Sequence, residues 1–301
     1  MRAPYRWQLR SRALELGPRT LVMGVVNVTP DSFSDGGQFF DAKHAIAHAL
    51  QMLEDGADIL DIGGESTRPG TGVLPDESGQ KPVVTEDEEL RRVIPVIEGV
   101  LQSRPDALVS IDTYKSGVAR RAIEAGAEIV NDVSAFQWDA SMPGTCRELN
   151  CGVVLMHTRG QPGEWRKLPP EADITSLVMR DLGNRVQVAL EGGVARERIV
   201  LDPGFGFGKN FEENYPLLAH FDHLQRLGFP LLAGTSRKSF VGRTTGKRRG
   251  GEDAPPDERL YGSLAAMVAS ILHGAHIVRV HDVRPAVEAA AIADEILAAE
   301  K

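Results

Sequence analysis

The hydrophobic pattern of the chain contains one phrase three times. A helical pattern ends at a glycine, an alanine follows, and a short apolar run comes next, as in EDGADILDIG, EAGAEIVNDV and LHGAHIVRVH. Glycine ends a helix readily because it adopts the left-handed conformation, and the apolar run is typical of a buried parallel strand. The glycines are Gly56, Gly126 and Gly274, which lie 70 and 148 positions apart. These separations divide into steps of about 35 to 37 residues, the size of one strand-helix unit.

Apolar runs at this period fill the chain, and helical patterns lie between them. One such helix is predicted from Asp41, a candidate N-cap, to Asp55. Alternating strands and helices predict a parallel sheet, and 301 residues hold about eight units, which favours a closed α/β fold, the (β/α)8 TIM barrel. A doubly wound sheet is the alternative, although no GxGxxG follows the first strand. The predicted strands are Leu21–Val26, Ile59–Ile62, Leu108–Ile111, Ile129–Val130, Gly152–Met156, Ile199–Leu201, Pro230–Ala233 and Ile277–Val280.

We predict a single barrel domain with a short N-terminal addition. Residues 1–20 contain alternating runs that predict a β-hairpin closing the bottom of the barrel, and residues 21–301 form the barrel itself. Pro69–Pro82 and Arg243–Pro256 are rich in glycine, proline and charge. Both are therefore predicted to be surface loops rather than domain boundaries.

The composition argues against several classes of protein. Hydrophobic residues make up 42% and charged residues 25%, as in an ordinary soluble globular protein. The net charge of -8 argues against a nucleic-acid partner, which needs a basic surface. No segment reaches the roughly 20 apolar residues of a membrane span, so no membrane partner is expected. Cys146 and Cys151 lack partners at metal-ligand spacing and are interpreted as reduced bystanders, which favours a cytoplasmic location.

Polar residues follow almost every predicted strand. In a (β/α)8 barrel the catalytic face lies at the carboxyl ends of the strands, so such residues can carry chemistry. Each of them alone could be a helix cap or a turn residue, and it is their coincidence on one rim that favours a catalytic site. They are Asn27 after the first strand, Thr67 and Arg68 after the second, Asp112 and Asn131 after the third and fourth, Asp202 after the sixth, Ser236 and Lys238 after the seventh, and Arg279 and His281 at the eighth.

The types of side chain suggest a substrate with a flat polar ring and an anionic group. Asp112, Asn131, Asp202 and Lys238 offer the donors and acceptors that an amide- and amine-bearing heterocycle needs. A second group contains cations and a hydroxyl on an otherwise acidic protein, which suggests phosphate or pyrophosphate. Its members are Thr67, Arg68, Arg279 and His281.

The GFGFG segment after Asp202 places glycines where the backbone can approach a ligand. It would display Phe205 and Phe207 as apolar walls, while the alternative is a plain tight turn. No Ser-His-Asp or catalytic cysteine signature is present, so a covalent nucleophile is not expected.

Seven of these motifs, in order, resemble those of the dihydropteroate synthases. They run from MGVVNVTPDSFSDGG through GGESTRPG, SIDTYKS, VNDVSA, LDPGFGFGKN and GTSRKSFVG to VRVHDV, and the resemblance extends from about Leu21 to Leu297. It implies a barrel enzyme that condenses 6-hydroxymethyl-7,8-dihydropterin pyrophosphate with para-aminobenzoate and releases pyrophosphate. It also implies a homodimer, for which the helices around Leu264–Leu272 and Val287–Leu297 are candidate contacts.

The resemblance assigns a role to each candidate residue. Those expected to be catalytic are Asp112, Lys238, Arg279 and His281, with Asp112 offsetting positive charge that develops at the pterin methylene carbon. Pterin is expected to contact Asp112, Asn131, Met156, Asp202, Phe205 and Lys238. Pyrophosphate is expected at Asn27, Thr67, Arg68, Arg279 and His281, with Asn27 helping to hold Mg2+. Para-aminobenzoate is expected at Arg68, Pro69, Phe207 and Ser236.

The chain also departs from the family pattern in places. TGVLPDESGQKPVV makes a longer connection than usual, and RTTGKRRGGEDAPPDERL is predicted to be a basic loop. HTRG follows Met156, and we interpret His157 there as structural. Two other functions stay open: a barrel of the corrinoid methyltransferase type that holds methyltetrahydrofolate, and a non-catalytic pterin-binding relative.

Overall fold

The computed structural model describes residues 2–28, 37–65 and 84–299. In these ranges the strands form two sheets, an antiparallel hairpin and an eight-stranded parallel sheet. The hairpin strands are β1 (Tyr5–Gln8) and β2 (Ala13–Leu16). The parallel strands are β3 (Leu21–Asn27), β4 (Ile59–Gly63), β5 (Val109–Asp112), β6 (Ile129–Asp132), β7 (Gly152–Met156), β8 (Ile199–Asp202), β9 (Leu232–Ala233) and β10 (Ile277–Val280).

The parallel sheet curls into a barrel. Its strand order is β8-β7-β6-β5-β4-β3-β10-β9, and a parallel bridge between Leu201 and Leu231 joins β8 to the residue before β9. The Leu201 amide also donates to the Pro230 carbonyl at 3.0 Å, so the two edges of the sheet meet. The prediction of a (β/α)8 barrel is therefore confirmed, and the doubly wound alternative is wrong.

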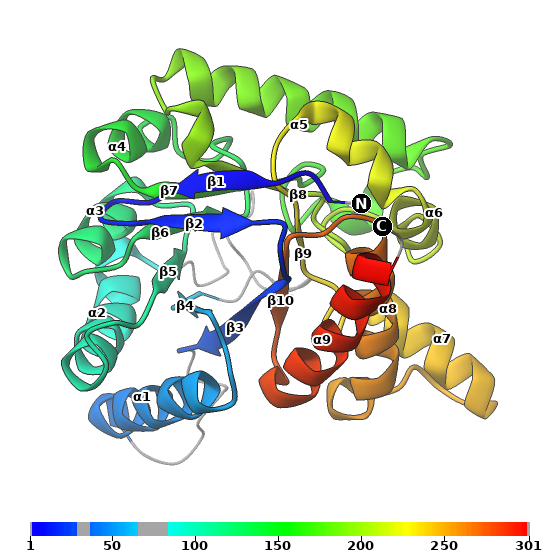
Figure 1. The fold of residues 1–301 in the computed structure, drawn as a ribbon, viewed down its shortest axis with the longest axis horizontal. Coiled ribbons are helices and arrows are strands. Elements are labelled where there is room, and N and C mark those ends of the chain that lie inside the picture. The colour runs from blue at the N-terminus through cyan, green and yellow to red at the C-terminus, as the bar shows by residue number, and fades with distance from the viewer. Residues whose placement is uncertain (1, 29–36, 66–83, 300–301) are drawn as a thin grey trace.

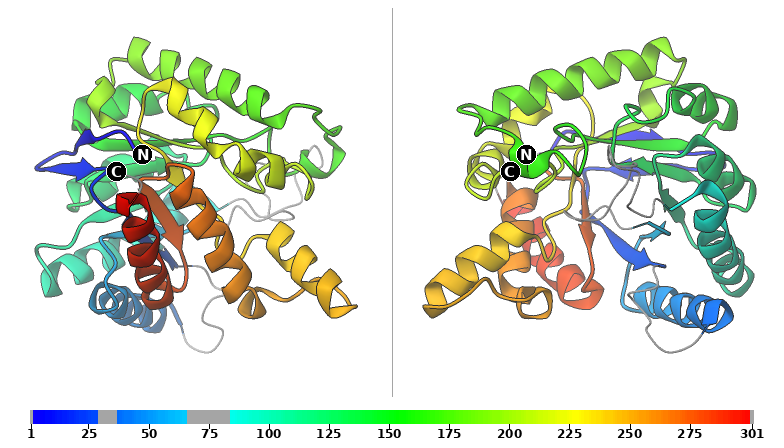
Figure 2. Two further views of the ribbon diagram at one scale, coloured as in Figure 1. Left: turned by 45° about the vertical axis from the view of Figure 1, so that its right-hand side comes forward. Right: turned by 180° about the vertical axis from the view of Figure 1, so that it is seen from behind.

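Helices surround the strands on the outside (Figures 1 and 2). Among the described residues, no helix combines the length and the apolar character that crossing a membrane requires. The α-helices are α1 (Gly37–Glu54), α2 (Glu86–Ser103), α3 (Ser116–Glu124), α4 (Met142–Leu149), α5 (Ile174–Glu191), α6 (Asn214–Ala219), α7 (Ser239–Arg249), α8 (Leu260–Leu272) and α9 (Val283–Ala299). Short 3-10 turns lie at Trp165–Lys167, Arg196–Arg198, Phe221–Leu227 and Pro256–Glu258.

Two predictions about helices are wrong. Asp41 lies inside α1, which begins at Gly37, so it is not the N-cap. The predicted loop Arg243–Pro256 is helical as far as Arg249, because α7 continues to that residue before Gly250, in the left-handed conformation, ends it. The glycine at position 246 suggested a loop, but the structure gives it another role. The Glu252 carbonyl oxygen packs against its backbone, and a Cβ there would lie 2.0 Å from that oxygen.

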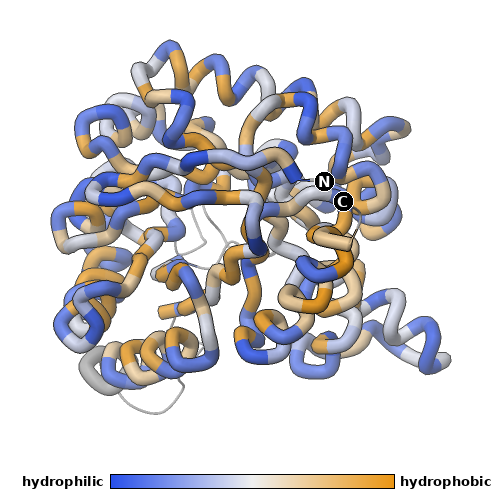
Figure 3. The backbone as a smooth tube through the Cα atoms, viewed as in Figure 1, coloured by the Kyte–Doolittle hydropathy of each residue, from blue (hydrophilic) through white to orange (hydrophobic). Residues whose placement is uncertain are grey.

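The lower part of the barrel interior is apolar and is closed by the hairpin, as predicted. The hairpin lies in front of the strands in Figure 1 and behind them in the right-hand view of Figure 2. Trp7, only 1% exposed, and Leu9 join the apolar cluster inside the barrel, and Gly152 leaves the room they occupy. Figure 3 shows the central strands mostly in the orange of hydrophobic residues. The members of this cluster from the parallel strands are Leu21, Met23, Ile59, Ile129, Val154, Val200, Leu232 and Ile277, and Leu108 joins them just before β5.

Candidate active site

The strands that supply the apolar cluster inside the barrel carry polar side chains two residues farther along. Alternate residues of a strand point to the same side, so these polar side chains form the next layer of the barrel interior, toward the carboxyl ends of the strands. In this layer Ile59 is followed by Asp61, Ile129 by Asn131, Val200 by Asp202 and Ile277 by Arg279.

A cavity of about 370 Å3 lies on this polar layer. Its lining brings together every residue predicted to contact pterin, includes Gly204 of the predicted GFGFG segment, and adds Val133 and Gly234, which were not predicted. The lining residues are Asp112, Asn131, Val133, Met156, Asp202, Gly204, Phe205, Phe207, Gly234, Lys238 and Arg279.

Arg279 is the centre of the hydrogen-bond network in the cavity. Its Nε donates to Asp61 Oδ2 and its Nη2 donates to Asp112 Oδ2, both at 2.6 Å. Asn131 Nδ2 donates to the same Asp61 oxygen at 2.9 Å. Asp61 is fully buried and was not predicted to belong to the site. Its signal was present in the repeated phrase, where Asp61 holds the position that Asn131 and Arg279 hold in the other two copies.

Burial raises the pKa of two carboxyl groups in the cavity toward neutral pH. Desolvation raises the pKa of Asp112 to about 7, with the positive charge of Arg279 lowering it and the negative charge of Asp61 adding to the rise. Desolvation likewise raises the pKa of Asp202 to about 6, although the Gly204 amide donates to Asp202 Oδ1 at 2.7 Å and opposes the shift. Both groups can therefore either accept or donate a hydrogen bond near neutral pH.

We expect Asp112→Asn to stabilise the fold at pH 8 by about 1–2 kcal/mol while impairing pterin binding. Because the folded-state pKa of Asp112 lies above the unfolded value near 3.8, folding favours the protonated carboxyl. The wild type therefore loses stability as pH rises from about 4 to about 7, and an amide does not. Urea unfolding of both proteins at pH 5 and pH 8 measures the difference. A wild type that is equally or more stable than the variant at pH 8 would contradict this account of Asp112.

The glycine-rich segment after β8 forms one wall of the cavity. The ammonium of Lys238 lies over the ring of Phe207 in a cation–π contact, with Nζ 3.9 Å from the ring centroid. The same ring packs edge-on against Trp165. Phe205 also lines the cavity, but its side chain is fully buried against Phe221 rather than displayed to solvent. Of the two predicted apolar walls, Phe207 alone combines a place in the lining with partial exposure.

The residues predicted to contact pyrophosphate lie on the same rim as far as the structure describes them. Asn27 ends β3, and His281 follows β10, where its Nδ1 lies 3.0 Å from Ser236 Oγ. Nε and Nη2 of Arg279 are engaged by carboxylates, and its contact with pyrophosphate stays a prediction. Thr67, Arg68 and Pro69, together with the predicted loop Pro69–Pro82, lie outside the described residues.

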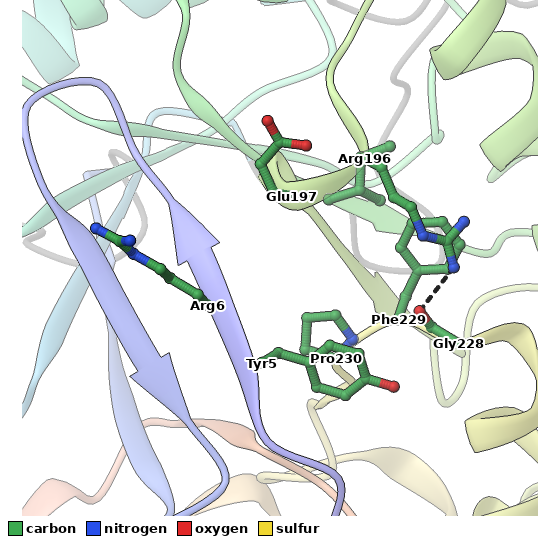
Figure 4. Close-up of a pocket in the computed structure, with 8 residues that line it drawn as sticks. Tyr5, Arg6, Arg196, Glu197, Gly228, Phe229 and Pro230 are labelled. Atoms are coloured by element: carbon green, nitrogen blue, oxygen red, sulfur yellow. Dashed lines mark hydrogen bonds between the residues drawn. The ribbon is translucent and has the colours of Figure 1, made fainter.

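A second cavity, of about 490 Å3, lies at the opposite end of the barrel, beside the hairpin (Figure 4). Tyr5, Phe229 and Pro230 give it an apolar character. The Arg196 guanidinium stacks 3.9 Å from the centroid of the Phe229 ring and donates to the Gly228 carbonyl at 2.9 Å. This cavity is larger, but it contains none of the predicted site residues and lies away from the face on which barrel enzymes carry their chemistry.

Comparisons with known proteins agree with this geometry. Residues 23–281 match the model of a family described as pterin binding enzymes. The dihydropteroate synthase of Bacillus subtilis is 42% identical over 288 residues, which cover 95% of this chain and 91% of that protein. A solved structure of Xanthomonas albilineans dihydropteroate synthase with 4-aminobenzoic acid superimposes with a TM-score of 0.86 at 42% identity, covering 98% of this chain and 99% of that one.

A second structure of the Xanthomonas albilineans enzyme, in complex with 7,8-dihydropteroate, gives a TM-score of 0.81 at 39% identity over 97% of this chain and 99% of that one. Identity of this degree covers nearly the whole length of both partners. The chain therefore belongs to the pterin binding enzyme family and, within it, to the dihydropteroate synthases.

Proposed function

We propose that this chain joins 6-hydroxymethyl-7,8-dihydropterin pyrophosphate to para-aminobenzoate, giving 7,8-dihydropteroate and pyrophosphate. The observation that carries the proposal is the polar layer above an apolar barrel interior, where Asp112, Asn131, Asp202 and Lys238 line one cavity. A pterin ring carries amide and amine groups along its edge. Those groups need buried partners, because an unpaired one would cost about 1–3 kcal/mol.

In the proposed reaction the bond between the pterin methylene carbon and the pyrophosphate oxygen breaks, and its electrons leave with pyrophosphate. The amine of para-aminobenzoate then donates its lone pair to that carbon and loses a proton to solvent. Asp112 offsets the positive charge that develops on the pterin, while Arg279 and His281 stabilise the departing anion. Phe207 and Ser236 contact para-aminobenzoate, together with Arg68 and Pro69.

Magnesium is part of the proposal through Asn27. Within the described ranges, no group of three His, Cys, Asp or Glu residues is arranged to hold a metal. Asn27 is partly exposed at the end of β3, and its amide oxygen suits an ion that takes its other ligands from phosphate and water. When bound, the ion would neutralise charge on the leaving pyrophosphate.

A pyrophosphate-release assay tests the proposed function against both alternatives. Purified protein is given the pterin pyrophosphate with Mg2+, with and without para-aminobenzoate. We expect pyrophosphate and 7,8-dihydropteroate in equal amounts when both substrates are present. A non-catalytic relative would bind the pterin and release nothing, and a corrinoid-type barrel would bind methyltetrahydrofolate in preference to the pyrophosphate. Either outcome would overturn the proposal.

We further propose that the chain forms a homodimer through α8 and α9. Most of the large apolar side chains that stay exposed among the described residues lie on these two adjacent helices, and such a patch is typical of an interface. The exposed apolar residues of α8 and α9 are Tyr261, at 81% exposure, Leu272, Ile292, at 65%, and Ile296.

We also propose a cytoplasmic location, which the buried free thiols of Cys146 and Cys151 support.

We expect Ile292→Lys to weaken dimerisation by at least about tenfold, because it places a charge in the apolar centre of the proposed interface. Gln187→Lys, at an exposed position of α5, is the matched control. Sedimentation equilibrium should give twice the chain mass of 32.7 kDa for the wild type and the control, and a lower mass for Ile292→Lys at the same concentration. A monomeric wild type, or equal masses for all three proteins, would contradict this interface.

A further inference from the structure

Lys209 is a buried lysine that lies behind the glycine-rich wall of the cavity rather than in its lining. Its Nζ donates to the Gly204 carbonyl at 2.8 Å and to the Phe207 carbonyl at 3.2 Å. The third contact of Nζ is His157 Nδ1, at 2.9 Å. In its ammonium form Nζ has three N–H donors, and these three acceptors match all of them. Burial lowers the pKa of Lys209 to about 7, with the negative charge of Asp202 opposing the shift, so the ammonium form predominates below that pH.

His157 is held in the state that this contact requires. Burial, together with the positive charge of Lys209, lowers the pKa of His157 to about 4, so the ring is neutral. Because Nδ1 accepts from Lys209, the ring proton belongs on Nε2, which lies 3.4 Å from Asp181 Oδ2. Asp181 therefore favours the tautomer that presents a lone pair to Lys209.

The two carbonyls that Lys209 binds are the ends of the turn that carries the cavity wall. Gly204, Gly206 and Gly208 all have positive φ, and a Cβ at Gly204 would lie 2.0 Å from the His157 carbonyl oxygen. The Phe207 amide closes the turn by donating to the Gly204 carbonyl at 3.1 Å. A turn in which every second residue is glycine has many unfolded alternatives, so its shape depends on the contacts that fix it.

We infer that Lys209, oriented by His157, is a positioning residue that fixes the Gly204–Phe207 turn and thereby the wall against which the pterin ring binds. The inference rests on the proposed function, since it specifies how that site is held. Lys209 acts through Gly204, whose amide binds Asp202, and through Phe207, whose ring meets Lys238. This role goes beyond the structural one expected for His157, because it connects the His157 side chain to ligand affinity.

Lys209→Met tests the inference because it keeps the length and burial of the side chain and removes its donors. We expect the Kd of the pterin pyrophosphate, measured calorimetrically well below the unfolding temperature, to rise about tenfold. The amides of Gly206 and Phe207 should also exchange hydrogen faster than in the wild type. Unchanged affinity in a folded Lys209→Met protein would overturn the inference, and the proposed function would stand if the wild type still binds and turns over its substrates.

A pair of substitutions at His157 keeps the test valid if Lys209→Met does not fold. The amide of His157→Asn can place an oxygen near the position of Nδ1 and retain an acceptor for Lys209, whereas that of His157→Gln reaches toward the Nε2 position and Asp181. We expect nearly wild-type pterin affinity for His157→Asn and affinity weakened about tenfold for His157→Gln. A purely structural role would lower the unfolding temperature of both and leave the two Kd values equal, which would overturn the inference. A wild type that binds no pterin would instead count against the proposed function.

Discussion

Replacing Arg279 by methionine is expected to destabilise the fold by about 3–5 kcal/mol at pH 8 and to abolish pterin capture. Asp61 and Asp112 both accept short hydrogen bonds from this guanidinium, and Asp61 is fully buried. Removal of the arginine leaves two carboxylates close together without a cation. A buried charge without its partner costs more than the pair contributes, so the loss should exceed that of an ordinary surface ion pair.

The loss should depend on pH with a definite sign. Arg279 lowers the pKa of Asp112, so without it that pKa rises above about 7. At pH 5.5 Asp112 is then protonated in the variant and carries no unpaired charge, so the destabilisation should be smaller than at pH 8. Urea unfolding at both pH values measures this change, and the double variant Arg279→Met/Asp112→Asn should recover part of the stability at pH 8. An Arg279→Met protein as stable as the wild type at pH 8 would show that the hydrogen bonds of Arg279 to Asp61 and Asp112 do not contribute this free energy to stability.

Lys238→Met is expected to raise the Kd of the pterin pyrophosphate about a hundredfold while changing stability by less than about 1 kcal/mol. Lys238 lines the cavity and is partly exposed, so the folded protein does not depend on its burial. The ammonium supplies a charged donor to the ring edge, and methionine keeps only the apolar part of the side chain. Calorimetric titration measures the affinity, and thermal unfolding measures the stability.

Arg243→Met is the matched control for Lys238→Met. Arg243 is an exposed cation on α7 whose guanidinium stacks 4.3 Å from the centroid of the Phe211 ring, much as Lys238 stacks on Phe207. The control therefore also loses a contact between a cation and an aromatic ring, but it lies outside the cavity lining. Equal affinities for the two variants would contradict the placement of pterin beside Lys238.

The barrel could be predicted from the sequence because its signals are local and repeated. Each strand is a short apolar run, and the turns before three of them contain glycines that take positive φ, Gly56, Gly126 and Gly274. The side chains on the rim could be predicted as well, because strand ends are easily located and Asn131, Asp202 and Arg279 follow apolar positions directly. A closed parallel sheet then places them together without any information about long-range contacts.

The errors arise where tertiary packing decides the outcome. Gly246 lies in α7, where the Glu252 carbonyl packs so close that no side chain would fit, and local composition does not show that contact. Asp61 and Lys209 were not assigned to the site because their roles depend on partners far along the chain, Arg279 for the first and His157 for the second. Sequence pattern shows where a polar side chain is buried, but not which distant group it meets.

The central claim is that a pterin ring occupies the polar layer at the carboxyl ends of the barrel strands. A crystal structure of the chain with bound 7,8-dihydropteroate tests this claim most directly. The account predicts that the edge of the pterin ring lies within about 3.2 Å of side-chain polar atoms of Asp112, Asn131, Asp202 and Lys238, and that the aminobenzoate part of the product lies against Phe207. A ring bound in the cavity beside Tyr5 and Phe229, or in the polar layer without those hydrogen bonds, would contradict it.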